Sequence, residues 1–144
     1  MRYVSRVLVV DDEPDIHEIL TVYLSREGID VENALTGEEG VKMYKKMHDE
    51  RRIPDLVIMD LNLSGEKGME GIDLHREGKG KRMDGVRATE QILDINPDAV
   101  IWGYTAWSDT EWAERLRDAG AKKVVKRLVP FKEFAEMVAD FLEE

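Results

Sequence analysis

The chain has 144 residues, which is the length of one domain, and its 21 basic and 31 acidic side chains give a net charge of −10. This acidity disfavours nucleic acid as a partner, because the phosphate backbone repels a negatively charged surface. The chain contains no cysteine, which excludes disulfide bonds, thiolate catalysis and cysteine-ligated zinc.

The N-terminal residues lead directly into an apolar run, without the hydrophobic segment or the cleavage site of a signal peptide. No apolar stretch approaches the ~18 residues that a membrane-spanning helix needs. We therefore expect a single soluble, cytoplasmic domain over residues 1–144 that does not contact membranes.

The first half of the chain predicts two strand–helix units. Short β-branched apolar runs between helical segments are typical of buried parallel strands. Pro14 suits the first turn of a helix, and Thr36 with Glu39 three residues later forms a capping box. The elements expected here are a strand over residues 6–10, a helix ending at Gly28, a strand over 29–35 and a helix from Thr36 to Arg51.

The second half continues the alternation of strands and helices. Pro54 introduces the third strand, and the turn at residues 96–98 introduces the fourth. The elements expected here are a strand ending at Asp60, a helix from Gly85, a strand ending at Thr105, a helix capped by Ser108 or Asp109, a strand over 123–126 and a last helix after Pro130.

This alternation predicts an α/β fold, a doubly wound parallel sheet with helices on both faces. Polar residues stand at the ends of four strands: Asp11 and Asp12 at the first, Asp60 at the third, Thr105 at the fourth and Lys126 at the fifth. In an open parallel sheet, ligands bind at the edge where the carboxyl ends of the strands lie. The sequence therefore predicts a small site for a metal ion and a phosphate group at this edge.

The segment VLVVDDEPDI at residues 7–16 resembles the opening of the response-regulator receiver domains of two-component signalling. The family's other marks have counterparts in the same order at Asp60 with Asn62, at Met83-Asp84-Gly85, at Thr105 with Ala106 and at Lys126. The resemblance covers nearly the whole chain. It implies a five-stranded, flavodoxin-like sheet in the order 2-1-3-4-5.

The resemblance also implies a Mg²⁺ site. Asp11, Asp12 and Asp60 would supply carboxylate oxygens, and Asn62 would supply its backbone carbonyl. Mg²⁺ is a hard cation that binds oxygen ligands and retains several waters, so it needs few carboxylates. Mn²⁺ is a possible substitute, because it favours the same ligands.

In such a domain Asp60 would accept a phosphoryl group from a sensor histidine kinase or a phosphotransfer protein. A carboxylate is already ionised at neutral pH, so it attacks phosphorus without a base. Thr105 would donate a hydrogen bond to the phosphoryl group, and Lys126 would neutralise its charge. A downstream protein partner would read the phosphorylated state. The chain would then be a signalling protein and not an enzyme, assisting only its own phosphorylation and dephosphorylation.

Two other functions remain open. The chain could be a receiver-like adaptor that binds proteins without being phosphorylated, or a hydrolase that uses an aspartyl phosphate. The hydrolase is disfavoured, because the chain shows no substrate-pocket signature and Asp60 lacks the Asp-x-Asp pattern of such phosphatases. We expect a monomer or weak dimer without direct nucleic acid binding.

Two segments depart from the family's pattern. An insert at about residues 65–83 separates the third strand from the third helix, and it is either a surface loop or a lid beside Asp60. After the fifth strand, additional residues precede the proline that usually follows the lysine directly. Arg127 is therefore the alternative to Lys126 as the cation that faces the phosphate. The sequence favours Lys126, because it follows the apolar pair at 124–125 directly.

His17 lies on the first expected helix, beside Glu18. A histidine in this setting is more often a solvated helix residue than a phosphorelay histidine. We therefore expect its side chain to face solvent.

Overall fold

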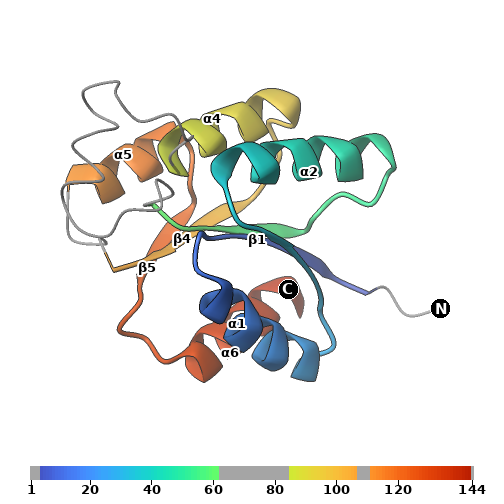
Figure 1. The fold of residues 1–144 in the computed structure, drawn as a ribbon, viewed down its shortest axis with the longest axis vertical. Helices are drawn as coiled ribbons and strands as arrows, with labels where there is room; N and C mark the ends of the chain where they lie inside the picture. Colours follow the sequence, from blue (N-terminus) through green and yellow to red (C-terminus); the bar gives the residue numbers. More distant parts are fainter. Residues whose placement is uncertain (1–3, 62–84, 107–110, 144) are drawn as a thin grey trace.

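The computed structural model describes residues 4–61, 85–106 and 111–143 (Figure 1). Five parallel strands form one sheet in the order β2-β1-β3-β4-β5, which confirms the expected flavodoxin-like fold. The strands are β1 Arg6–Val10, β2 Asp30–Ala34, β3 Leu56–Met59, β4 Ile101–Thr105 and β5 Lys123–Lys126.

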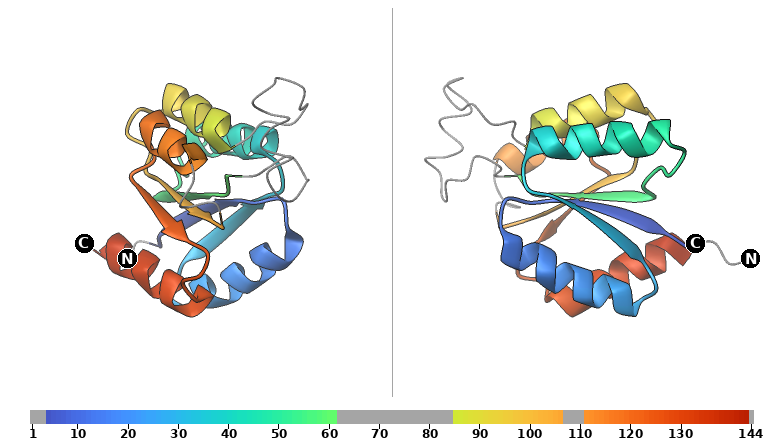
Figure 2. Two further views of the ribbon diagram at one scale, coloured as in Figure 1. Left: turned by 90° about the vertical axis from the view of Figure 1, so that its left-hand side faces the viewer. Right: turned by 45° about the vertical axis from the view of Figure 1, so that its right-hand side comes forward.

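Helices cover both faces of the sheet, as expected (Figure 2). The helices on one face are α2 Gly37–Asp49, α4 Gly85–Ile95 and α5 Glu111–Ala119, and those on the other face are α1 Pro14–Arg26 and α6 Phe131–Glu143. Within the described ranges, none of these helices has the length and apolar character needed to cross a membrane.

The central strands are apolar on both sides because both faces are covered. In β1, Val7 and Val9 pack into the core beneath α1 and α6, whereas Leu8 and Val10 pack into the core on the opposite face. β3 alternates in the same way. Two covered faces explain the continuous apolar runs in the sequence, and they leave the strand ends as the places where polar side chains can gather.

Local signals in the sequence account for several helix ends. The Thr36 hydroxyl accepts a hydrogen bond from the Glu39 backbone N–H at 3.0 Å, and the Glu39 carboxylate accepts one from the Leu35 N–H at 3.4 Å. Gly28 closes α1 with a φ of +79°, a conformation that favours glycine. The expected cap at Ser108 or Asp109 and the insert at 65–83 lie outside the described residues.

The first residue of α4 packs directly against the end of β3. The Gly85 N–H donates a hydrogen bond to the Leu61 carbonyl at 3.3 Å. A Cβ atom at position 85 would overlap the carbonyl oxygen of Asp60 and would lie 3.1 Å from the Leu61 Cα. Backbone therefore meets backbone here, and the close approach requires glycine.

Candidate functional site

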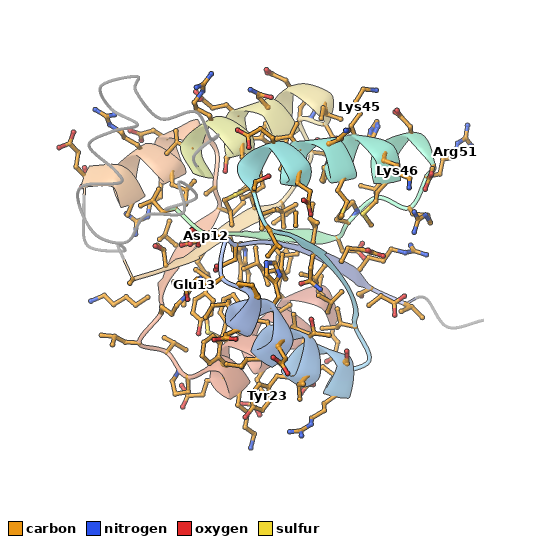
Figure 3. The ribbon with its side chains drawn as sticks, in the orientation of Figure 1. Asp12, Glu13, Tyr23, Lys45, Lys46 and Arg51 are labelled. Atoms are coloured by element: carbon orange, nitrogen blue, oxygen red, sulfur yellow. The ribbon has the colours of Figure 1, made fainter. Side chains whose placement is uncertain are left out.

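Three acidic side chains meet at the carboxyl-terminal edge of the sheet. Asp11 and Asp12 follow β1, and Asp60 follows β3, the neighbouring strand. The Asp60 N–H donates to the Val10 carbonyl at 2.9 Å, so the pairing of the two strands continues to their ends. One carboxylate oxygen from each acid lies within 4.8 Å of the other two. Figure 3 shows Asp12 at this edge, far from Arg51 at the opposite end of the molecule.

Arg127 brings a positive charge to these acids. Its Nη2 atom lies 2.7 Å from Asp11 Oδ2 and 3.9 Å from Asp60 Oδ1. The same nitrogen donates a hydrogen bond to the Tyr104 carbonyl. The Arg127 Nε is buried and meets no acceptor among the described residues. The guanidinium therefore holds Asp11 through one nitrogen and retains a donor for another oxygen.

The sequence favoured Lys126 as the cation of the site, but the structure brings Arg127 to the carboxylates. Lys126 ends β5 and is exposed, whereas only 18% of the Arg127 side chain is exposed. Side chains alternate along a strand, so Arg127 lies on the same side of the sheet as Val125. Val125 and Tyr104 belong to the same hydrophobic core. The same alternation, applied to the sequence, would have placed Arg127 on this side of the sheet.

The Tyr104 ring supports the guanidinium. Arg127 Cζ lies 5.0 Å from the ring centre, within cation–π range, and the ring also stacks on Phe134, with ring centres 3.8 Å apart, and packs edge-to-face on Phe131 at 5.8 Å. The Tyr104 hydroxyl donates to the Val129 carbonyl at 2.7 Å. Burial raises the pKa of Tyr104 to about 12, so the ring stays neutral. The Tyr104 ring, which is held by its hydroxyl hydrogen bond and by its stack on Phe134, thus fixes the plane on which the guanidinium lies.

The carboxylates are only partly neutralised by Arg127. Burial raises the pKa of Asp60 well above that of an ordinary aspartate, and the charge of Asp11 raises it further. Arg127 opposes this shift without reversing it. Burial lowers the pKa of Arg127, but the charges of Asp60 and Asp11 outweigh that effect, so the guanidinium stays charged. Because Arg127 carries one positive charge and the three acids can carry three negative ones, Arg127 alone leaves a net negative charge that attracts a further cation.

The donor set fits a hard divalent cation. Asp11 and Asp60 are buried, Asp12 is half-buried, and all three supply the oxygen ligands that Mg²⁺ prefers. An ion at this edge would relieve the repulsion that raises the pKa of Asp60. The three acids could therefore hold a metal ion. Asn62, the expected source of a backbone ligand, lies outside the described residues.

Replacing Asp60 by asparagine should stabilise the metal-free protein above acidic pH. The folded state holds the Asp60 proton more tightly than the unfolded chain does, so unfolding free energy falls as pH rises from the ordinary aspartate pKa through the raised one. Above that interval the carboxylate is ionised, and the folded state bears the full cost of its burial and of its repulsion by Asp11. Urea unfolding in EDTA should show Asp60→Asn more stable than the parent by about 1 kcal/mol or more near pH 8.

The stability gain of Asp60→Asn should shrink towards about pH 4, where the carboxyl group of the parent protein is protonated. A gain of the same size at every pH would contradict the account of a buried, repelled carboxylate. Tyr44→Phe serves as the comparison, because it removes one side-chain hydrogen bond, from Asn96, away from the acids.

Thr105 reaches the same edge of the sheet. It is the last residue of β4 and is completely buried. Its backbone carbonyl accepts a hydrogen bond from the Arg127 N–H at 3.1 Å. A backbone hydrogen bond therefore joins Thr105, the expected hydroxyl residue, to Arg127.

The prediction that His17 faces solvent is wrong. The residue is only 6% exposed, and its ring lies between the end of β1 and the edge strand β2. Its Nε2 atom contacts the backbone carbonyl of Asp11 at 2.7 Å. The position of His17 beside Glu18 suggested solvent exposure. Helical periodicity instead places it next to the buried Ile16, on the face of α1 that packs on the sheet.

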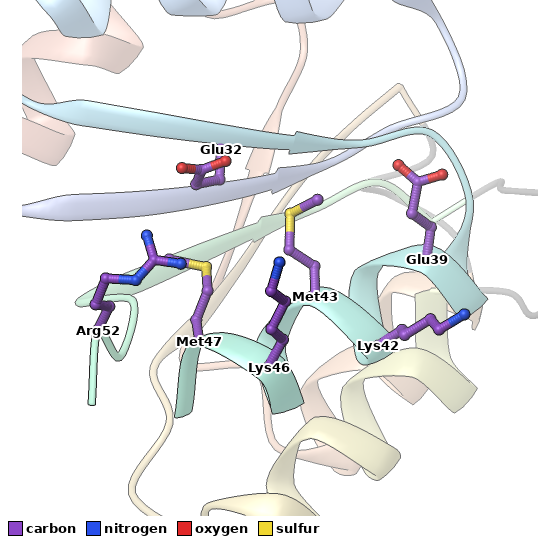
Figure 4. A pocket seen from close by; sticks show the side chains of 7 residues that line it. All are labelled: Glu32, Glu39, Lys42, Met43, Lys46, Met47 and Arg52. Atoms are coloured by element: carbon purple, nitrogen blue, oxygen red, sulfur yellow. The ribbon is translucent and has the colours of Figure 1, made fainter. Parts of the chain in front are cut away.

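A groove of about 380 Å³ between β2 and α2 contains none of the acids of the site. Its lining residues are Glu32, Glu39, Lys42, Met43, Lys46, Met47 and Arg52 (Figure 4). Met43 and Met47 form its apolar floor, and charged side chains surround it. The carboxylates therefore lie at the carboxyl ends of β1 and β3 and not inside this groove.

Comparison with known proteins points to one family. The family model described as the response regulator receiver domain matches residues 7–81. The chemotaxis protein CheY of Treponema pallidum is 29% identical over 139 residues, which cover 96% of this chain and 83% of that protein. Several other curated relatives are longer, and the chain spans only 27% to 38% of their length.

Solved structures give the same picture of the fold. A CheY-like receiver domain protein from Methanospirillum hungatei superimposes with a TM-score of 0.76 at 21% identity, over 98% of this chain and 95% of that one. A chain of the CheX–CheY–BeF₃–Mg²⁺ complex from Borrelia burgdorferi gives a TM-score of 0.73 at 21% identity, over 96% of this chain and 89% of that one. At these identities the likeness concerns the fold.

Proposed function

Because the chain belongs to the family of response regulator receiver domains, we propose that it is a phosphoacceptor switch in which Asp60 receives the phosphoryl group. Receiver domains are signalling modules of two-component systems and are generally not enzymes. The proposed donor is a sensor histidine kinase or a phosphotransfer protein. The proposed reader of the phosphorylated state is a protein partner in the cytoplasm.

The observation that carries this proposal is the meeting of Asp60 with two further acids and a guanidinium. An attacking carboxylate and a phosphoryl donor are both negatively charged, so transfer requires neutralisation of charge. Arg127 Nη2 lies 3.9 Å from Asp60 Oδ1, and its buried Nε–H has no acceptor among the described residues. Guanidinium groups bind phosphate oxygens through two nitrogens. We therefore assign to Arg127 the role that the sequence favoured for Lys126.

Transfer needs one nucleophilic step from this chain. A carboxylate oxygen of Asp60 attacks the phosphorus, and the bond between phosphorus and the donor's leaving group breaks with its electron pair leaving on that group. Mg²⁺, when bound, would neutralise charge on the phosphoryl oxygens. Asp11, Asp12 and the Asn62 carbonyl would hold it together with Asp60. Thr105 would donate its hydroxyl hydrogen to a phosphoryl oxygen.

The product would change the charge of the site and thereby bias its conformation. Phosphorylation adds roughly 1.5 to 2 negative charges, by analogy with phosphoserine. A hydrogen bond from Thr105 to the new oxygens would draw the end of β4 towards Asp60. This is a population shift between two states that a protein partner can distinguish. The CheX–CheY complex of Borrelia burgdorferi supports a protein as the reader.

We propose a monomer or weak dimer without nucleic acid binding.

Phosphorylation by a small acyl phosphate tests the proposal. The protein is incubated with the donor and Mg²⁺, and intact mass is followed over time. We expect one phosphoryl adduct that EDTA prevents and that Asp60→Asn does not form. The asparagine variant is a sound control, because it is expected to be at least as stable as the parent. If no adduct forms at any donor concentration, the receiver-like adaptor that binds proteins without phosphorylation replaces the switch.

A further inference from the structure

His17 is a buried polar residue to which the proposed phosphoryl transfer gives no role. It lies in the first turns of α1 and is only 6% exposed. Its Nε2 atom is 2.7 Å from the backbone carbonyl oxygen of Asp11, and its Nδ1 atom is 2.5 Å from Asn33 Oδ1. Both ring nitrogens are therefore occupied inside the fold.

The partner of Nε2 determines the protonation of that nitrogen. A backbone carbonyl only accepts hydrogen bonds, so Nε2 carries a proton and donates it to the Asp11 oxygen. Asn33 meets the other nitrogen from β2, where it pairs in register with Val9 of β1. The ring is thus held between the edge strand and the loop that follows β1, with its donor directed at Asp11.

The carbonyl that His17 binds belongs to the peptide that joins the two adjacent acids of the site. β1 ends at Val10, so regular pairing with β3 does not orient this peptide. The Asp11 N–H donates to the Ala34 carbonyl at 3.1 Å, and the Asp11 C=O accepts from His17. These two bonds, with the Glu13 N–H that donates to Asp11 Oδ1 at 2.9 Å, set the direction in which the chain leaves Asp11. That direction determines where the carboxylate of Asp12 can reach.

We propose that His17 is a positioning residue of the divalent-cation site. By holding the Asp11–Asp12 peptide, its Nε2–H sets the geometry in which these two carboxylates bind the ion. The inference rests on the metal site of the proposed function. Hydrogen-bonded supports of metal ligands typically change affinity by about 10- to 100-fold when they are removed.

Calorimetric titration of the metal-free full chain with Mg²⁺, and separately with Mn²⁺, tests the role of His17. In His17→Gln the side-chain amide nitrogen lies near the former place of Nε2, whereas in His17→Asn it lies near that of Nδ1. His17→Leu keeps a similar volume and removes both ring nitrogens. We expect His17→Leu and His17→Asn to weaken binding about tenfold, and His17→Gln to stay within about threefold of the parent.

Tyr44→Phe is the matched control. It removes a hydrogen bond between the Tyr44 hydroxyl and the Asn96 side chain, at 3.1 Å, on the other face of the sheet. This change should lower stability in urea without moving the metal dissociation constant. If His17→Leu does not fold, the comparison of the glutamine and asparagine variants alone decides the matter.

Each outcome of the titrations has one meaning. Absence of Mg²⁺ binding by the parent protein overturns the metal site and the proposed function with it. Normal binding by the parent and by every His17 variant overturns only the positioning role. Binding by His17→Gln as weak as that by His17→Asn also overturns it, because the hydrogen bond to Asp11 would then not be the cause.

Discussion

Replacement of Arg127 by methionine is expected to slow the phosphorylation of Asp60 by an acyl phosphate about a hundredfold. Methionine has a similar length but no charge, so the variant loses the guanidinium that lies 3.9 Å from the Asp60 carboxylate. Without the guanidinium, the negatively charged donor approaches three carboxylates whose charge is less neutralised, and the repulsion slows transfer. The rate is measured by intact mass against time at saturating Mg²⁺, so that a change in metal affinity does not enter the comparison.

Three further variants separate position, charge and geometry. Arg127→Lys keeps the charge without the planar fork, and we expect it to recover the rate to within about tenfold of the parent. Lys126→Met and Lys122→Met remove the same unit of charge from exposed positions, and both should stay within about threefold of the parent, because solvent screens them. A larger loss of phosphorylation rate in Lys126→Met than in Arg127→Met would show that Lys126 is the cation that faces the phosphate.

Replacement of Gly85 by alanine is expected to destabilise the protein by about 1–3 kcal/mol and to slow its phosphorylation. The added Cβ would overlap the carbonyl oxygen of Asp60 and crowd the Leu61 Cα. Both neighbours are backbone atoms at the end of β3, so neither can rotate away. Relief requires α4 to shift or Asp60 to move. Urea unfolding measures the stability, and the acyl phosphate assay measures the position of the acceptor.

Gly103→Ala is the comparison for the Gly85 variant. Gly103 lies in β4, and its added Cβ would come within 2.7 Å of Leu116 Cδ2 and 3.3 Å of the Val124 methyl groups. The closest of these atoms is the end of a flexible side chain, so the site can relax at lower cost than at Gly85. Equal destabilisation by the two alanine substitutions would show that a clash with the Asp60 backbone costs no more stability than a clash with a flexible side chain, and would contradict the prediction.

The order and nature of the elements could be predicted because burial on both faces leaves a direct trace in the sequence. β1 and β3 read as unbroken apolar runs, and turn and cap residues such as Thr36 and Gly28 mark the ends of the helices. The meeting of Asp11, Asp12 and Asp60 follows from parallel pairing of neighbouring strands, which brings their carboxyl ends to one edge.

The contacts around the acids were harder to predict because they depend on side-chain direction after a strand has ended. Adjacency to an apolar pair favoured Lys126 as the cation that faces the phosphate, whereas the residue that forms the ion pair with Asp11 is Arg127. His17 looked solvated beside Glu18, but a backbone carbonyl and Asn33 bind both of its ring nitrogens. These hydrogen bonds join His17 to residues 6 and 16 positions away, and although helical periodicity indicates burial of His17, it does not identify these partners.

Chemical identification of the phosphorylated residue tests the central claim most directly. Borohydride reduces the acyl phosphate of an aspartate to the alcohol, which converts that residue to homoserine, and peptide mass analysis then locates the change. After treatment with an acyl phosphate and Mg²⁺, the account predicts homoserine at position 60 and unchanged aspartate at positions 11 and 12. Reduction at either of those neighbours instead, or no reduced residue in a protein that binds Mg²⁺, would contradict it.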